Sequence, residues 1–225
     1  MKTPSQLAVV IVAGGKGLRL GANLPKQFLP LAGKPMLMRT IEKFYEFDNY
    51  MQIVVVLHQR YVNYWKELCV EYDFNVSCEL VVGGDTRFES VKNGLALVKD
   101  YKIVAIHDAA RPLVTKELIA QCYHHSKKEQ CGIIPVVEEK NSLREVIDST
   151  HKPLDRTNIR IVQTPQTFPA NLIKKAYQTN YGIHFTDDAT VAENDGVFVK
   201  LIQGEDSNIK ITTSIDMEFA SFLLK

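Results

Sequence analysis

The chain has 225 residues, 45% of them hydrophobic, so it is long enough for one substantial core and short for two. Lysine and arginine number 27 against 26 acidic residues, which excludes the broad positive field that holds nucleic acid or an anionic membrane. We therefore expect one domain over residues 1–225 whose basic residues act locally, with no nucleic-acid or membrane partner.

The first strong pattern is an apolar run followed by a glycine-rich segment. Residues 7–12 are rich in β-branched side chains without polar interruption, which is typical of a parallel strand buried on both faces. The sequence AGGKGLRLG follows at 13–21, and PKQF follows at 25–28. Glycines allow close backbone approach, and Lys16, Arg19 and Lys26 add positive charge. Ligands of open α/β sheets bind beyond the carboxyl ends of strands, so anion binding is favoured over a plain strand-to-helix turn.

Two familiar phosphate-binding loops are excluded. A P-loop needs Gly-Lys-Ser or Gly-Lys-Thr at its end, and the chain contains neither tripeptide. The dinucleotide fingerprint fails because Leu20 stands where its third glycine belongs, and no acidic residue lies at the distance that ribose recognition requires.

Strands and helices then alternate along the chain. We expect strands at 53–57, 79–82, 103–106, 132–137 and 197–203, and helices at 36–47, 60–72 and from the second glycine loop to about Val98. This alternation predicts a doubly wound α/β fold with a mostly parallel sheet and right-handed crossovers. The last helix carries Ile215, Phe219, Phe222 and Leu223 at helical spacing, and we expect it to cover the sheet.

A second glycine loop, GGDTRFES at 83–90, again follows a predicted strand. A flat base and ribose could lie against Gly83 and Gly84, with Ser90 reaching a base edge. Asp85 or Thr86 could equally serve only as the cap of the helix that follows, because such side chains accept from free backbone amides.

The segment HDAARP at 107–112 ends a central strand. Asp108 is placed to hold Mg²⁺ against a polyphosphate, since this ion prefers one or two carboxylates together with phosphate oxygens. The alternative is that it caps the helix that starts near Thr115. Arg111 is interpreted as a partner of a phosphate or of Asp108, and His107 as a residue that holds the loop by a hydrogen bond and not as a general base.

Residues 138–162 are charged, mixed and only weakly periodic, which indicates an extended arm or hairpin. An arm of this length needs a surface to pack on. The cysteines, at 69, 78, 122 and 131, show no metal spacing or C-x-x-C pair, the N-terminus lacks a secretory pattern, and no apolar stretch approaches the ~20 residues of a membrane-spanning helix. These features predict a soluble, cytoplasmic protein.

The motif AGGxGxR with a downstream PKQF resembles the signature loop of the sugar-phosphate nucleotidyltransferases, and within them the cytidylyltransferases of small polyol phosphates. HDAARP, TDDA at 186–189 and NIKIT at 208–212 extend the resemblance from residue 9 to about 216. They favour the branch that acts on 2-C-methyl-D-erythritol 4-phosphate over its ribitol 5-phosphate relative. Gly14 and the LPLxGKP segment at 29–35 instead mildly favour the branch that acts on ribitol 5-phosphate.

The resemblance implies a Rossmann-like nucleotidyltransferase fold and transfer of CMP from CTP to the polyol phosphate, in non-mevalonate isoprenoid precursor synthesis. It implies Mg²⁺ at Asp108 and a homodimer in which the arm embraces the partner and Arg156 reaches the acceptor phosphate. Asn141 stands where the family commonly has Asp, which makes the arm contacts less secure. A non-catalytic nucleotide or sugar-phosphate binding module is the alternative of another class. The implied catalytic residues are Arg19, Lys26 and Lys210; the nucleotide contacts are Ala13, Gly14, Gly15, Gly17, Gly83, Gly84, Asp85 and Ser90; the acceptor contacts are Asp108, Arg111, Ser142, Arg156, Thr164 and Thr186.

Overall fold

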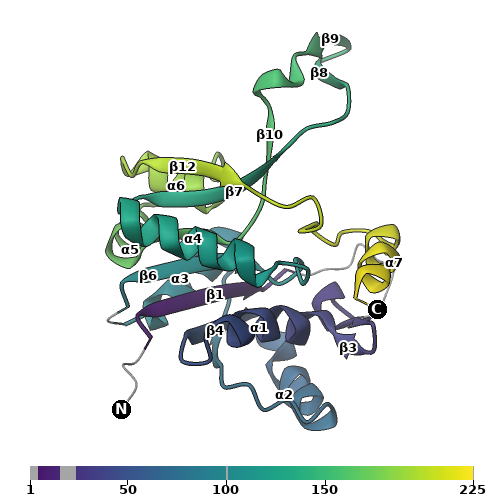
Figure 1. Ribbon diagram of the computed structural model, residues 1–225, viewed down its shortest axis with the longest axis vertical. Helices are drawn as coiled ribbons and strands as arrows, with labels where there is room; N and C mark the ends of the chain where they lie inside the picture. The colour runs from purple at the N-terminus through teal and green to yellow at the C-terminus, as the bar shows by residue number, and fades with distance from the viewer. Residues whose placement is uncertain (1–4, 16–23, 100, 225) are drawn as a thin grey trace.

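A central sheet of eight strands organises the computed structural model, which describes residues 5–15, 24–99 and 101–224 (Figure 1). The strand order is β10-β7-β11-β6-β1-β4-β5, and β12 pairs with β7. β1 pairs in parallel with β4 and β6, β4 with β5, and β7 with β12. β11 is antiparallel to both β6 and β7, and β10 is antiparallel to β7. With the other four pairs parallel, the predicted mostly parallel sheet is confirmed. The strands of this sheet are β1 (Leu7–Ala13), β4 (Gln52–Leu57), β5 (Glu79–Val82), β6 (Ile103–Asp108), β7 (Gly132–Glu138), β10 (Arg160–Val162), β11 (Gln166–Pro169) and β12 (Val199–Gln203).

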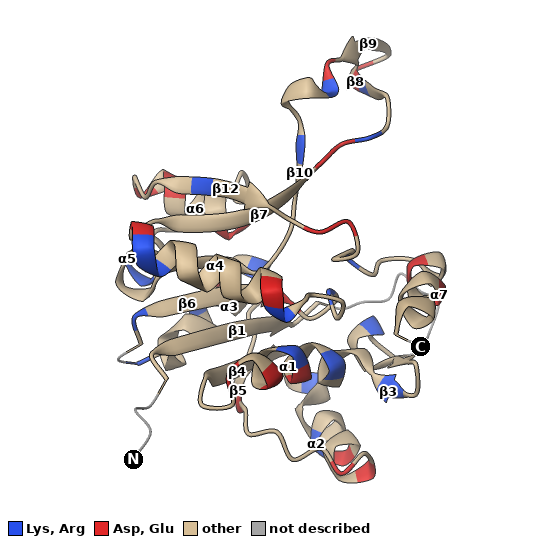
Figure 2. Ribbon diagram, in the orientation of Figure 1, with Lys and Arg blue, Asp and Glu red and all other residues tan. Residues whose placement is uncertain are grey.

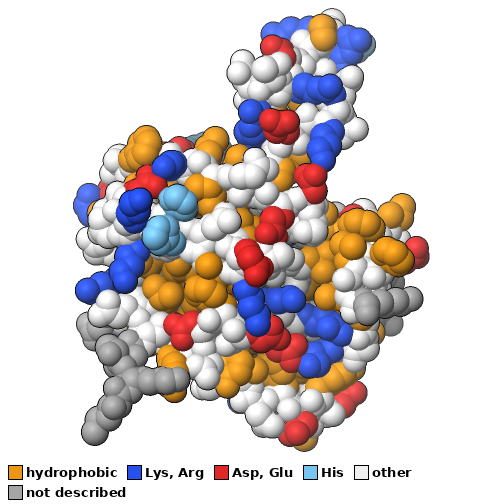
Figure 3. All heavy atoms as spheres, viewed as in Figure 1, with side chains coloured by type: hydrophobic (Ala, Val, Ile, Leu, Met, Phe, Trp, Pro, Cys, Tyr) orange, Lys and Arg blue, Asp and Glu red, His pale blue; other side chains and the backbone are white. Residues whose placement is uncertain are grey.

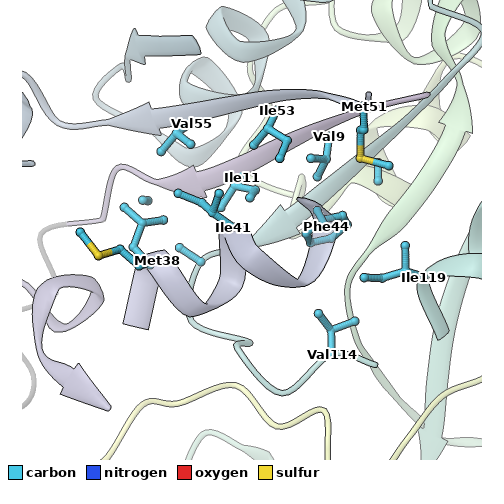
Figure 4. Close-up of a cluster of buried hydrophobic side chains, with 14 of the residues drawn as sticks. Val9, Ile11, Met38, Ile41, Phe44, Met51, Ile53, Val55, Val114 and Ile119 are labelled. Atoms are coloured by element: carbon cyan, nitrogen blue, oxygen red, sulfur yellow. The ribbon is translucent and has the colours of Figure 1, made fainter. Parts of the chain in front are cut away.

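Helices cover both faces of the sheet, as a doubly wound fold requires. Alternate residues of β1 serve opposite faces: Val9 and Ile11 join the cluster under α1, α2 and α4, while Ala8 and Val10 join the cluster under α3, α5 and α6. Figure 4 shows the first cluster, with side chains of α1 against β1 and β4. The helices are α1 (Met36–Phe47), α2 (Val62–Glu71), α3 (Arg87–Leu97), α4 (Lys116–Glu129), α5 (Ala170–Ala176) and α6 (Asp188–Asn194).

Short elements connect these layers near the carboxyl ends of the strands. β2 (Pro30–Leu31) and β3 (Lys34–Pro35) form a small separate ladder before α1. Single 3₁₀ turns occur there at η2 (Lys26–Phe28) and η3 (Gln59–Tyr61), and a third, η4 (Arg156–Asn158), lies in the arm. None of the helices in the described parts of the chain combines the length and the hydropathy that crossing a bilayer requires.

The arm contains an antiparallel hairpin that extends well beyond the body of the molecule (Figure 1). Its strands are β8 (Leu143–Ile147) and β9 (Thr150–Leu154). Figure 2 shows both signs of charge along it. The ends of the predicted 138–162 segment belong to the sheet, because Glu138 closes β7 and β10 pairs with β7. The projecting part is therefore shorter than the sequence pattern indicated.

The expectation for the last helix was wrong. α7 (Ser214–Leu223) buries Ala220 in a small cluster with residues such as Leu31, Met36 and Ile211, away from the two clusters that line the sheet. The apolar stripe that was expected to cover the sheet is instead exposed, with Ile215 at 75% and Phe222 at 71%. Figure 3 shows hydrophobic side chains gathered on this part of the surface. The spacing identified a helix with an apolar face, but not the surface that this face meets.

Candidate functional site

A cavity of about 660 Å³ opens at the carboxyl ends of β1 and β6. Both glycine loops and the segment after β12 contribute to it, so three separated parts of the chain meet where an open α/β sheet binds its ligands. A neighbouring hollow of about 460 Å³ shares His58, Gly84 and Asp85 with it and is also lined by Gly83. The residues that line the main cavity are Val12, Ala13, Gly14, Gly15, Lys26, Gln27, His58, Gly84, Asp85, Thr86, Arg87, Ser90, Asp108, Ala109, Ala110, Lys210 and Thr212.

Gln27 holds the start of the first glycine loop. Its buried amide donates from Nε2 to the carbonyl oxygens of Ala13 at 2.8 Å and Gly15 at 3.3 Å. Lys26 donates from Nζ to the Ile211 carbonyl at 2.7 Å, so the loop is also joined to the segment that carries Lys210. Gln27 was part of the PKQF motif, but its role was not predicted. Lys16, Gly17 and Arg19 lie outside the described residues.

Ser90 links the two glycine loops. Its Oγ accepts from the Gly84 amide at 3.2 Å, and the side chain is almost fully buried. A Cβ added at Gly83 would lie 2.7 Å from this Oγ, and one added at Gly14 would lie 3.2 Å from it. The glycines thus permit both loops to close on Ser90. Ser90 lines the cavity, and its contact with a base edge stays a prediction.

The two capping alternatives resolve in different ways. Thr86 caps α3, and Glu89 completes a capping box by accepting from the Thr86 amide at 3.0 Å. Asp85 is exposed and lines the cavity. Thr115 caps α4 by its own hydroxyl, so Asp108 is not that helix's cap.

Asp108 lies between two cations in the cavity. Its Oδ2 is 2.7 Å from Lys210 Nζ, and its Oδ1 is 3.6 Å from Arg87 Nη2. Burial acts to raise the pKa of this carboxyl, but the charges of Arg87 and Lys210 outweigh it and hold the pKa well below its usual range. The carboxylate is therefore ionised at neutral pH, as a ligand for a hard cation must be.

Asp108 is a buried carboxylate that can bind Mg²⁺ in the cavity, but the described residues supply no complete set of protein ligands. The described residues contain no group of three or more His, Cys, Asp or Glu side chains able to hold a metal ion by themselves. Mg²⁺ commonly keeps water and binds through one or two carboxylates plus substrate phosphates. Asp108 fits the role of such a single carboxylate ligand beside a nucleotide.

His107 holds its loop as expected. The ring is fully buried, with Nε2 3.1 Å from the Arg111 carbonyl and Nδ1 3.1 Å from the Thr164 hydroxyl. Burial lowers the pKa of His107 to about 4, so the ring is neutral at physiological pH. Thr164 Oγ1 also accepts from the Asp108 amide at 3.1 Å, which fixes the end of β6. Thr164 thus holds the backbone beside the cavity.

Arg111 is buried, so the prediction that it is not a solvated charge is confirmed. Its guanidinium donates to the carbonyl oxygens of Asn208 at 2.7 Å and Val162 at 3.2 Å, and the charge of Asp108 also attracts it. Arg111 therefore ties the root of the arm to the segment just before Lys210. The alternative contact with a phosphate stays a prediction. Arg111 Nε is buried without a hydrogen-bond partner among the described residues.

Sequence reasoning missed the partner of Arg87. Its guanidinium binds Asp188 through two hydrogen bonds of 2.8 and 2.7 Å, although 101 residues separate the two along the chain. Asp187 caps α6, whereas the carboxylate of its neighbour Asp188 accepts from Arg87. One signal in the sequence could have indicated such a partner. Arg87 is a basic residue in the first turn of a helix, where acidic residues are preferred.

The remaining acceptor candidates lie outside the lining of this cavity. Thr186 is exposed on the segment just before α6. Ser142 is exposed in the arm, and so is Arg156, which donates to the Lys140 carbonyl. Since the arm extends away from the body, the structure does not bring Ser142 and Arg156 to this chain's own cavity (Figure 1).

Comparison with known proteins shows which protein family this chain is similar to. Residues 7–225 match the family model described as 2-C-methyl-D-erythritol 4-phosphate cytidylyltransferase. A Bacteroides fragilis protein of that name is 48% identical over 215 residues, which make up 96% of this chain and 98% of the relative. A Porphyromonas gingivalis protein of the same name is 45% identical over 216 residues, 96% of each chain. The solved structure of a Francisella tularensis protein of that name is 31% identical, with a TM-score of 0.79 and coverage of 97% of this chain and 99% of that one.

Proposed function

This chain belongs to the 2-C-methyl-D-erythritol 4-phosphate cytidylyltransferase family, and we propose that the cavity at the ends of β1 and β6 is where its two substrates meet. The protein transfers CMP from CTP to 2-C-methyl-D-erythritol 4-phosphate and releases pyrophosphate, a step in the synthesis of isoprenoid precursors. Family membership sets aside the ribitol 5-phosphate acceptor and the non-catalytic binding module that the sequence left open.

We assign the nucleotide to the two glycine loops. Their backbones converge on Ser90, and Gly14, Gly15 and Gly84 line the cavity, so a base and ribose can lie flat against them. Lys26 and Lys210 line the same cavity and supply cations for the triphosphate. Arg19 is proposed as a third cation from the sequence motif alone.

The reaction needs positioning and charge stabilisation more than proton transfer. A phosphate monoester has a second pKa near 6, so the acceptor is largely a dianion at neutral pH. One of its oxygens attacks the α-phosphorus of CTP, forming a new P–O bond as the bond to the oxygen bridging the β-phosphate breaks. Pyrophosphate leaves with that electron pair. The neutral, fully buried His107 is consistent with a mechanism that has no general base.

Lys26 and Lys210 stabilise the charge that develops around the α-phosphorus in this proposal. Preorganised cations contribute most when they are fixed before the reaction, because they then need no reorganisation. Lys26 is fixed by the Ile211 carbonyl at 2.7 Å and Lys210 by Asp108 at 2.7 Å. When Mg²⁺ is bound with CTP it supplies further neutralisation of the phosphates, and Asp108 is the buried carboxylate that would hold it.

We further propose a homodimer in which each arm completes the partner's acceptor site. Ser142 and Arg156 lie on the arm, on either side of its hairpin, and that hairpin exposes Val146 at 73% and Ile147 at 49%. Apolar side chains at the tip of an arm are suited to contact with a second subunit. Thr186, Arg111 and Thr164 complete the proposed acceptor set from the body, Thr164 through the backbone it holds.

A cytoplasmic location is also proposed. It rests on four cysteines that are free in the structure and show no metal or disulfide spacing in the sequence. Fractionation of the source cells measures it directly.

The single observation that carries the functional proposal is the convergence of Lys26, Lys210 and Asp108 on one cavity with two glycine loops. The experiment is pyrophosphate release from CTP with 2-C-methyl-D-erythritol 4-phosphate, compared with ribitol 5-phosphate and with no acceptor. We expect release that depends on the methylerythritol acceptor. Nucleotide binding without release in any of the three reactions would contradict the proposal.

A further inference from the structure

A charge pair at the cavity wall joins a partly exposed cation, Arg87, to a buried carboxylate. Asp188, in the first turn of α6, has no exposed surface, and its two carboxylate oxygens accept from Arg87 at 2.8 and 2.7 Å. The Tyr177 hydroxyl donates to the same carboxylate at 2.6 Å. A buried carboxylate is costly unless it is paired and hydrogen-bonded, and this one has both forms of compensation.

Arg87 faces the cavity from this pair. Besides its two bonds to Asp188, it lies 3.6 Å from Asp108, which in turn lies 2.7 Å from Lys210. Charges of alternating sign therefore run from the first turn of α6, through Arg87, to the cavity.

The same region is packed as well as charged. Phe88, next to Arg87, stacks on Tyr177 with 4.8 Å between ring centroids and on Phe185 with 5.7 Å. Tyr177 and Phe185 belong to the connection between α5 and α6, which also contains Thr186. Arg87 and Phe88 thus attach that connection to the start of α3.

The nucleotide loop does not depend on Arg87 for its shape. It is held by the capping box of Thr86 and Glu89 and by the bond from Gly84 to Ser90. Arg87 occupies the first turn of α3, where a positive charge opposes the helix dipole. A residue that is unfavourable for its own helix, but paired twice with acidic groups of other elements, points to a role outside that helix.

We propose that Arg87, held by Asp188, whose carboxylate is held in turn by Tyr177, is a positioning residue that sets the Thr186 segment for the acceptor phosphate. The inference rests on the proposed assignment of Thr186 to the acceptor. It adds three residues to that site, and it predicts that their substitution affects acceptor use selectively, while CTP binding is retained.

The test measures KM for each substrate, kcat and melting temperature in Arg87→Lys and Tyr177→Phe. Arg87→Lys keeps the charge but loses the two-pronged fit to Asp188, so we expect acceptor KM to rise about tenfold, with CTP KM within about twofold and kcat within about threefold. Tyr177→Phe keeps the stacked ring and removes one hydrogen bond, and about a threefold rise in acceptor KM is expected. Lys175→Met is the matched control, because it breaks an ion pair with Asp195 just past the other end of α6.

Each outcome decides the inference. A rise in acceptor KM alone, with the control unchanged, supports it. An equal rise in both KM values, or no rise in a variant that melts like the wild type, overturns it. If Arg87→Lys melts far below the wild type, the KM ratio of Tyr177→Phe decides in the same way. Turnover by the wild type tests the proposed function separately, so the two failures are distinguishable.

Discussion

The ammonium of Lys210 lies 2.7 Å from Asp108 Oδ2, which joins the segment after β12 to the end of β6 inside the cavity. The Lys210 side chain is 45% exposed and that of Asp108 is 12% exposed. A phosphate oxygen can therefore reach the ammonium while the carboxylate keeps it in place. This pair is the centre of the proposed site.

Lys26→Ala should lower kcat by about 10²–10³ while CTP binding weakens much less, because a preorganised charge acts mainly on the transition state. Steady-state kinetics and calorimetric titration with CTP measure the two effects. Arg19→Ala should behave in the same way. Lys34→Ala is the control, since that lysine pairs with Glu42 beyond the cavity lining. An unchanged kcat at saturating substrates would remove Lys26 from the chemistry.

Asp108→Asn should preserve the fold and shift the Mg²⁺ titration of activity to higher concentration. An amide is neutral and a poorer ligand for a hard cation than a carboxylate. Asp206→Asn is a matched control from the segment that leads to Lys210, because Asp206 is exposed and pairs with Lys140. A Mg²⁺ dependence that is identical in Asp108→Asn and wild type would exclude Asp108 as a ligand.

The buried His107 should make stability fall in mild acid. Its pKa is about 4 in the folded protein against an ordinary value of 6.5, so between these values the unfolded chain binds the proton more readily. The contribution of His107 is present above pH 6.5 and is lost as the pH falls toward 4, amounting to about 2 kcal/mol between pH 7 and 5. Urea unfolding of wild type and His107→Gln at both pH values measures it. The variant should lose less stability over this interval, and equal losses would contradict the assignment.

Arg156 should act in the partner's active site. Lys26→Ala and Arg156→Ala should each be nearly inactive alone, but a mixed dimer has one site with both lesions and one with neither. Random exchange makes half the dimers mixed, so about a quarter of wild-type activity should return. Mixing Lys26→Ala with Lys210→Ala is the control, since both residues line one chain's cavity and every mixed site stays damaged. No recovery in the first mixture, with subunit exchange verified, would place Arg156 in its own chain's site.

Local sequence pattern predicted most of the sheet and its neighbouring helices. The apolar run of β1 and the helix over residues 36–47 were read correctly because burial on two faces, or on one helical stripe, leaves a periodic signal. The same signal misled for α7. Ile215 and Phe219 have helical spacing, but spacing does not specify which surface the stripe meets.

The site was predictable only in part for a related reason. Glycine loops and the basic residues beside them are local in sequence, so Gly14, Gly84 and Lys26 could be proposed from motif and position. The pairing of Arg87 with Asp188 joins residues that are 101 positions apart, and no local pattern encodes it. Arg111 could be identified as a buried cation from its motif, but its partner could not. It donates to the Val162 carbonyl, and the two residues come together only in the folded chain.

The most direct test of the account follows the phosphorus atoms of CTP. CTP labelled at either the α- or the γ-phosphate is incubated with 2-C-methyl-D-erythritol 4-phosphate and Mg²⁺, and the products are separated. We predict that the α label appears in the cytidine-linked polyol and the γ label in pyrophosphate, in equal amounts. Recovery of the α label as CMP or CDP, with no label joined to the polyol, would contradict cytidylyl transfer by this protein.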